Sequence, residues 1–90
     1  MKLSLEQLQK KRAEGLMYDF FEYENKWKEA IAKGKNFLDC HDIQIVAADI
    51  IGELEDAGLL HIAKEMYPHE KEVIEQWLEC YREIQSGVKI

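Results

Sequence analysis

The string Asp39-Cys40-His41-Asp42 combines the residue types that bind metal ions in proteins. Zinc prefers cysteine and histidine, and hard cations prefer carboxylate oxygens. Consecutive residues cannot all converge on one ion, however, and the spacing of common zinc ligands is absent. Asp39 is also a typical helix N-cap residue. We therefore interpret the string as the start of a helix and expect neither a metal nor another cofactor.

His61 and His69 are the histidines that could act as catalytic bases. No serine or cysteine is spaced to act as a nucleophile, and there is no glycine-rich phosphate loop. We expect both histidines to lie on the surface and the protein not to be an enzyme.

An acidic row near the C-terminus is the first candidate for a binding surface. Its glutamates lie three or four residues apart, so they share one helix face. The row is either a solvated face or a surface shaped to occupy a basic groove of a partner, as a nucleic-acid mimic would. Its members are Glu72, Glu75, Glu79 and Glu83.

Aromatic residues crowd the segment 18–27, YDFFEYENKW, with a spacing that is helical and typical of a core. Tyr18 and Phe21 fall beside the main apolar stripe. Aromatic side chains are enriched at interfaces. These two residues and the acidic row are therefore our candidate partner-binding residues.

Residues 46–61, VAADIIGELEDAGLLH, have the Ala48-to-Gly52 spacing of a helix-turn-helix. Glu53, Glu55 and Asp56 would then face phosphates without a compensating cation. A small DNA-binding regulator that uses this segment, or the basic cluster Lys10-Lys11-Arg12, is our first alternative function.

The net charge of −6 is unevenly distributed. Residues 1–36 hold eight Lys and Arg against six Asp and Glu, whereas residues 37–90 hold four against twelve. Phosphate binding requires clustered cations, so this distribution disfavours nucleic acid as a partner. There is no apolar run long enough for a membrane span and no signal-peptide core, so we expect a cytoplasmic protein without membrane contact.

Residues 4–34 are predicted to form one long helix of about 43 Å between its caps. Ser4 and Gln7 form a capping box at its start, and Gly34 suits the left-handed position after its end. Gly15 lies between the halves and favours a kink or a close helix–helix approach. The predicted inward stripe, with steps close to 3.6, is Leu5, Leu8, Ala13, Leu16, Phe20, Tyr23, Trp27 and Ile31.

Three shorter helices are predicted after it. One starts at the Asp39 cap and ends at Gly58, with Leu59 completing a Schellman motif. A short helix covers about 60–66, and a last one opens at Pro68 and stops near Gly87. The inward residues of the second and last helices are Ile43, Val46, Ala47, Ile50, Ile51 and Leu54, and Val73, Ile74, Trp77, Leu78, Tyr81 and Ile84.

We therefore predict a single all-α domain over residues 1–90, a small helical bundle. Its first helix is too long for the remaining chain to cover, which predicts a homodimer through that helix. The favoured function is a non-enzymatic module that binds a protein partner, as an inhibitor or adaptor of a nucleic-acid-handling complex of the kind that phages and mobile elements encode. A further alternative is an oligomer that binds a small ligand such as a nucleotide between its helices.

Overall fold

The computed structural model describes residues 3–34 and 37–87, without the side chains of residues 37–39. These ranges contain the helices α1 (Leu5–Ala32), α2 (Phe37–Asp56), α3 (Leu60–Met66) and α4 (Lys71–Gln85), and a 3₁₀ turn η1 (Pro68–Glu70). No strand occurs in either described range, so the predicted all-α class is confirmed.

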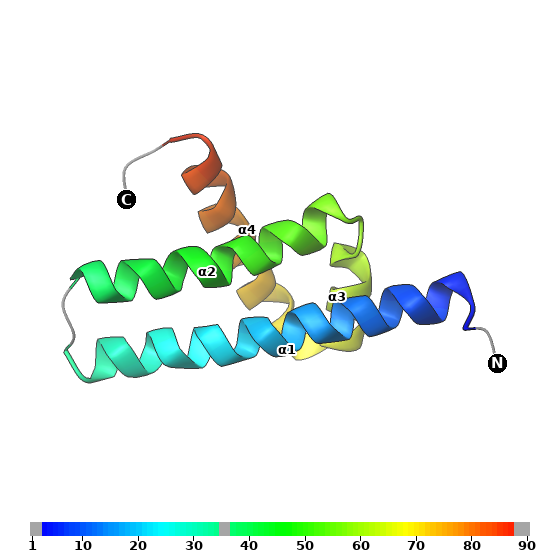
Figure 1. Ribbon diagram of the computed structural model, residues 1–90, viewed down its shortest axis with the longest axis horizontal. Helices are drawn as coiled ribbons and strands as arrows, with labels where there is room; N and C mark the ends of the chain where they lie inside the picture. The colour runs from blue at the N-terminus through cyan, green and yellow to red at the C-terminus, as the bar shows by residue number, and fades with distance from the viewer. Residues whose placement is uncertain (1–2, 35–36, 88–90) are drawn as a thin grey trace.

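Helices α1 and α2 form an antiparallel pair, and α4 crosses this pair on one side (Figure 1). Helix α3 packs against both α1 and α2 near the end where α2 stops. The first turns of α1 extend past α3 (Figure 1). The molecule is consequently elongated, with extents of 49 × 28 × 22 Å.

Both ends of α1 follow the local signals in the sequence. The Ser4 backbone N–H donates to Gln7 Oε1 at 2.8 Å, and the Gln7 N–H donates to Ser4 Oγ at 3.2 Å, which completes the predicted capping box. Gly34 adopts φ 70° just after the helix, in the left-handed region that glycine tolerates best. The predicted start of the long helix is therefore confirmed, and its end lies one residue before the predicted Lys33.

The turn between α2 and α3 is the predicted Schellman motif. Gly58 has φ 72°, its N–H donates to Glu55 O at 3.0 Å, and the Leu59 N–H donates to Leu54 O at 2.8 Å. Two backbone carbonyls at the end of α2 are thereby satisfied, and the chain reverses into α3.

Two predicted helix starts are wrong. Helix α2 begins at Phe37, so the backbone of Asp39 lies inside its first turn rather than at the N-cap. Pro68 opens η1 instead of α4. The Glu70 N–H donates to Tyr67 O at 2.9 Å, and Glu70 itself, at φ −103° and ψ 5°, leaves the α-helical region before α4 starts at Lys71.

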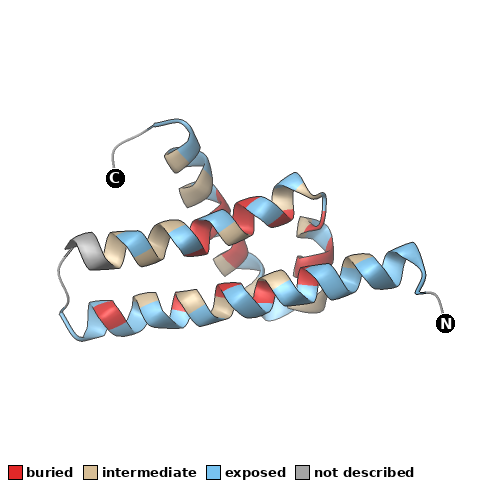
Figure 2. Ribbon diagram, viewed as in Figure 1, coloured by how far each residue is buried: buried red, intermediate tan, exposed pale blue. Residues whose placement is uncertain are grey.

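The core lies where α1, α2 and α4 meet, in the middle of the molecule (Figure 2). The Phe20 ring of α1 contacts the Trp77 ring of α4 edge to face, with centroids 5.8 Å apart. Each of the three helices contributes two of the largest fully buried side chains, which are Met17, Phe20, Ile51, Leu54, Ile74 and Leu78.

The predicted inward stripe of α1 is wrong at both ends. Leu5, Leu8 and Ile31 are 73%, 50% and 51% exposed. The buried face runs through Ala13, Met17, Phe20, Glu24 and Ala30, while Leu16, Tyr23 and Trp27 pack partly against the core. The stripe fails at the start because no described helix covers Leu5 and Leu8, and at the end because Ala30 rather than Ile31 lies on the buried face.

The other predicted inward faces are closer to the structure. Every residue predicted for α4 is buried or packed against the core. In α2, however, Val46 is 39% exposed and Ala48 is buried, so the buried face of α2 differs from the predicted one at these positions. Gly15 is exposed, with nothing within 4 Å of a Cβ placed there, so the predicted close helix approach is wrong.

Candidate functional site

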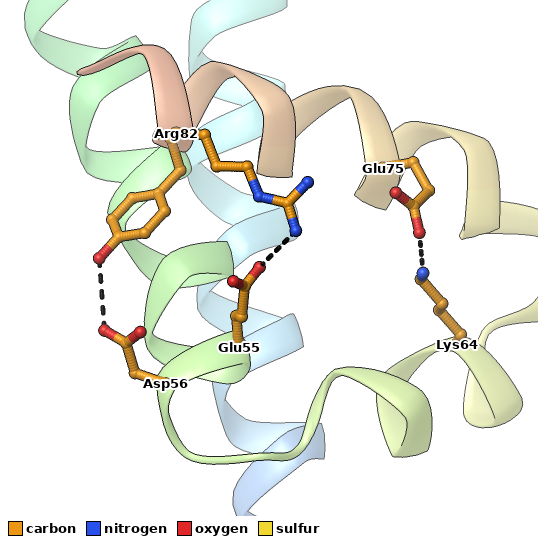
Figure 3. Close-up of polar contacts among 6 residues, drawn as sticks. Glu55, Asp56, Lys64, Glu75 and Arg82 are labelled. Atoms are coloured by element: carbon orange, nitrogen blue, oxygen red, sulfur yellow. Dashed lines mark hydrogen bonds and ion pairs between the residues drawn. The ribbon is translucent and has the colours of Figure 1, made fainter. Parts of the chain in front are cut away.

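The four predicted glutamates of α4 are all exposed and share one side of the helix; we call Glu72, Glu75, Glu79 and Glu83 the α4 acidic face. The Lys64 ammonium of α3 pairs with the Glu75 carboxylate (Figure 3). The other three glutamates form no ion pair with any described residue. Most of the negative charge of this face is therefore available to solvent or to a partner.

The C-terminal end of α2 adds further carboxylates beside α4. Arg82 Nη2 of α4 donates to Glu55 Oε2 at 3.3 Å, and the Tyr81 hydroxyl donates to Asp56 Oδ2 at the same distance (Figure 3). Arg82 is thus already engaged by an acidic residue of its own chain. The half-buried position of Tyr81 and the neighbouring charge of Asp56 raise the pKa of the Tyr81 phenol.

A glycine permits the close approach of these two helices. A Cβ added at Gly52 would lie 2.2 Å from Tyr81 Cε1, far inside van der Waals contact. The bare α-carbon of Gly52 thus leaves room for the Tyr81 ring against α2. This contact holds the second half of α2 against α4.

Tyr18 and Phe21 have different environments. Tyr18 is 73% exposed, in a shallow hollow that it shares with Lys11, Glu14 and Gly15 of its own helix. Phe21 is half-buried and packs its ring against Phe20 and Tyr67, at centroid distances of 5.7 and 5.2 Å. Of the two aromatic candidates, Tyr18 presents the more accessible ring.

The segment 46–61 covers the second half of α2, the Schellman turn and the start of α3. Its buried residues include Ala48 and Gly52, and its exposed ones include Asp49, Glu53 and Asp56. The surface that this segment offers is acidic. The basic residues Lys10, Lys11 and Arg12 are exposed on the projecting part of α1, where Lys10 pairs with Glu6 at 3.5 Å.

Across residues 3–34 and 37–87, no three His, Cys, Asp or Glu side chains are arranged to hold a metal ion. The side chain of Asp39, one member of the metal-like string, lies outside the described residues. His61 and His69 are exposed, as the sequence predicts.

A buried carboxylate at Glu24 is the feature that sequence reasoning missed. Glu24 is only 5% exposed, and its Oε2 accepts a hydrogen bond from Trp77 Nε1 at 3.2 Å. Lys28 Nζ lies 3.6 Å from Oε1. The carboxylate lines an open pocket of about 270 Å³ between α1, α2 and α4, which we call the Glu24 cavity. Its other lining residues are Trp27, Lys28, Gln44, Val73, Gln76, Trp77 and Cys80.

The spacing of residues in the sequence does indicate that Glu24 lies on the apolar face of its helix. Glu24 stands four residues after Phe20 and three before Trp27, which is the spacing of one helix face. A charged residue within an apolar stripe is buried only when it is paired or hydrogen-bonded. Its partner, the Trp77 indole, lies 53 residues away in the chain, and only the fold brings the two groups together.

Comparison with known protein families, curated proteins and solved structures found no match to this chain. Within the described residues, no helix combines the length and apolar character needed to cross a membrane.

Proposed function

We propose that this protein is a non-enzymatic interaction module that binds a basic surface of another protein through its α4 acidic face. The proposal rests on four exposed glutamates on one side of α4. Only one of them, Glu75, is paired with a described cation, Lys64. Like charges at this spacing destabilise a helix by a few tenths of a kcal/mol per pair, so a partner that neutralises them would gain affinity.

The geometry of this face supports an inhibitor or adaptor of a nucleic-acid-handling complex as the finer version of the proposal. From Glu72 to Glu83 the row spans about 16 Å of helix axis. Each strand of B-DNA carries roughly one charge per 3.4 Å, or about five over the same length. The four carboxylates, one of them paired with Lys64, carry somewhat less charge than one strand over this length, and a groove evolved for phosphates would attract them.

The second part of the proposal is a homodimer formed through α1. The helix extends past α3, and its first turns expose Leu5 and Leu8 on a segment that no other described element covers. Stable interfaces bury about 800 Å² per partner, which usually requires an apolar centre of this kind.

The test of the acidic face compares two charge-reversed proteins. In the first, the four glutamates of the α4 acidic face become lysine. In the matched control, four exposed acidic residues of α1 become lysine, so the net charge changes equally on another surface. The control residues are Glu14, Asp19, Glu22 and Glu29.

Wild type, variant and control are used to capture proteins from nuclease-treated lysate of the native host, and a captured protein is then purified and its binding measured directly. We expect to capture a basic protein that binds wild type and control equally well, with an affinity that falls as the salt concentration rises. Its affinity for the four-lysine variant should be lower by roughly a hundredfold or more. Equal binding of the variant, with unchanged circular dichroism, would exclude the acidic face as the binding surface.

A further inference from the structure

The cavity beside Glu24 has the chemistry of a cation site. Of its two charged lining residues, Glu24 is only 5% exposed whereas the Lys28 side chain is 61% exposed, so water screens the carboxylate less than the ammonium. Two indole rings line the same space, Trp27 and Trp77, with centroids 5.3 Å apart and planes at 79°. Indole faces attract cations through the ring quadrupole, most strongly where the site is desolvated.

The hydrogen bonding of Glu24 leaves room for a ligand. The Trp77 indole donates to Oε2, and this bond fixes the carboxylate at the wall of the cavity. At Oε1 the neighbour is Lys28, whose ammonium lies 3.6 Å away on a side chain that is 61% exposed. That separation exceeds a charge-assisted hydrogen bond of about 2.8 Å, so Lys28 is a loose counter-ion that a better-placed ammonium can displace.

The size and lining of the cavity restrict the ligand further. A volume of about 270 Å³ lies just below the range of roughly 300–1,000 Å³ typical of drug-sized ligands. Gln44 and Gln76 add amide groups, while Val73 and the indoles provide an apolar wall. A nucleotide is too large for this volume, and its phosphates would be repelled by the buried carboxylate. A short alkyl chain that ends in an ammonium group has a suitable size and the opposite charge.

We propose that this cavity binds a primary alkylammonium group, with Glu24 accepting hydrogen bonds from its N–H groups and the side chains of Trp27 and Trp77 lining the space for its alkyl chain. The ammonium takes the place of Lys28, which moves into solvent. The same chemistry is carried by a free small amine and by a lysine side chain of a bound protein. The site does not depend on the α4 acidic face, although Gln76 lines both this cavity and the hollow that contains Glu72 and Glu75.

The tryptophans make the test direct, because the chain has two and both line the cavity. Intrinsic fluorescence of the full chain is titrated with n-butylammonium chloride at constant ionic strength, and in parallel with n-butanol, its uncharged counterpart. We expect a saturable change with n-butylammonium and none with n-butanol at equal concentrations. No saturable change, or the same curve with both compounds, would overturn the proposal.

Two variants assign the binding to the carboxylate. Glu24→Gln keeps an acceptor for the Trp77 indole and should weaken n-butylammonium binding roughly tenfold or more, since a charged hydrogen-bond partner is lost. Lys28→Met removes the competing cation and should tighten binding by about threefold, the size of a surface ion pair. If circular dichroism shows that Glu24→Gln does not fold, the proposal is tested with Lys28→Met alone. An unchanged affinity of Lys28→Met for n-butylammonium would then reject the site.

A third compound, Nα-acetyl-lysine N-methylamide, distinguishes a lysine side chain of a partner from a free small amine, because it carries the two peptide groups that flank a lysine in a protein. Binding at least as tight as that of n-butylammonium supports a lysine side chain of a partner, because the flanking peptide groups are then accommodated. Much weaker binding of this compound supports a free amine at the same site.

Discussion

At the scale of single residues, two glycines inside helices have opposite roles. Gly52 lies where α2 and α4 approach, and a Cβ there would meet the ring of Tyr81 at 2.2–2.5 Å. Gly15 lies on exposed helix surface with nothing within 4 Å of the same added atom. The intrinsic helix preference of alanine over glycine is the same at both sites. The difference between the two Gly→Ala changes in unfolding free energy therefore measures the packing alone.

Gly52→Ala should lower the free energy of unfolding by about 1–3 kcal/mol, because the Tyr81 ring must move and its bond to Asp56 is disturbed. Gly15→Ala should raise it by about 0.5–1 kcal/mol. Urea unfolding followed by circular dichroism measures both. A stabilised Gly52→Ala protein would show that α2 and α4 do not approach as closely as described.

At the scale of helices, the ends were predictable where a local motif sets them. The Ser4–Gln7 capping box and the left-handed glycines Gly34, Gly58 and Gly87 involve contacts within a few residues, and a sequence displays these directly. The start of α4 was missed because a proline permits a 3₁₀ turn as readily as the first turn of an α-helix.

The faces of the helices were harder to predict than their ends. Leu5 and Leu8 continue the apolar period of α1, but a period does not say how far the neighbouring helices reach, nor that Ala30 rather than Ile31 is buried at the other end. The α4 acidic face could be predicted because it lies within one helix. The Glu24 cavity could not, since its walls come from three helices and depend on the angle at which α4 crosses the other two.

The Ser4 cap should stabilise only the first turns of α1. Residues 5–12 contain no buried side chain, and Ala13 is the first buried position of the helix. Ser4→Ala should therefore speed amide hydrogen exchange by about fivefold or more over residues 5–12, as expected for the loss of roughly 1 kcal/mol at an N-cap. Exchange in α2 and α4 should stay unchanged, and a uniform increase across all helices would contradict a locally acting cap.

At the scale of the whole molecule, the projecting turns of α1 determine the proposed assembly. Light scattering coupled to size exclusion should give the mass of two chains for the wild type. Leu5→Lys combined with Leu8→Lys should give the mass of one chain, because a charged residue cannot be buried at an apolar interface. The helical signal should persist, since both positions lie outside the core. A wild type of single-chain mass would refute the dimer.

The hydrogen bond between Trp77 and Glu24 also bears on how the chain folds. Helices α1 and α2 are neighbours in sequence, so their antiparallel pairing requires closure of only a short connection and should be fast. The bond between α4 and α1 instead joins residues 53 positions apart, which costs more loop-closure entropy. We therefore expect the α1–α2 hairpin to form first and α4 to dock later, a step that the fluorescence of the indoles would report.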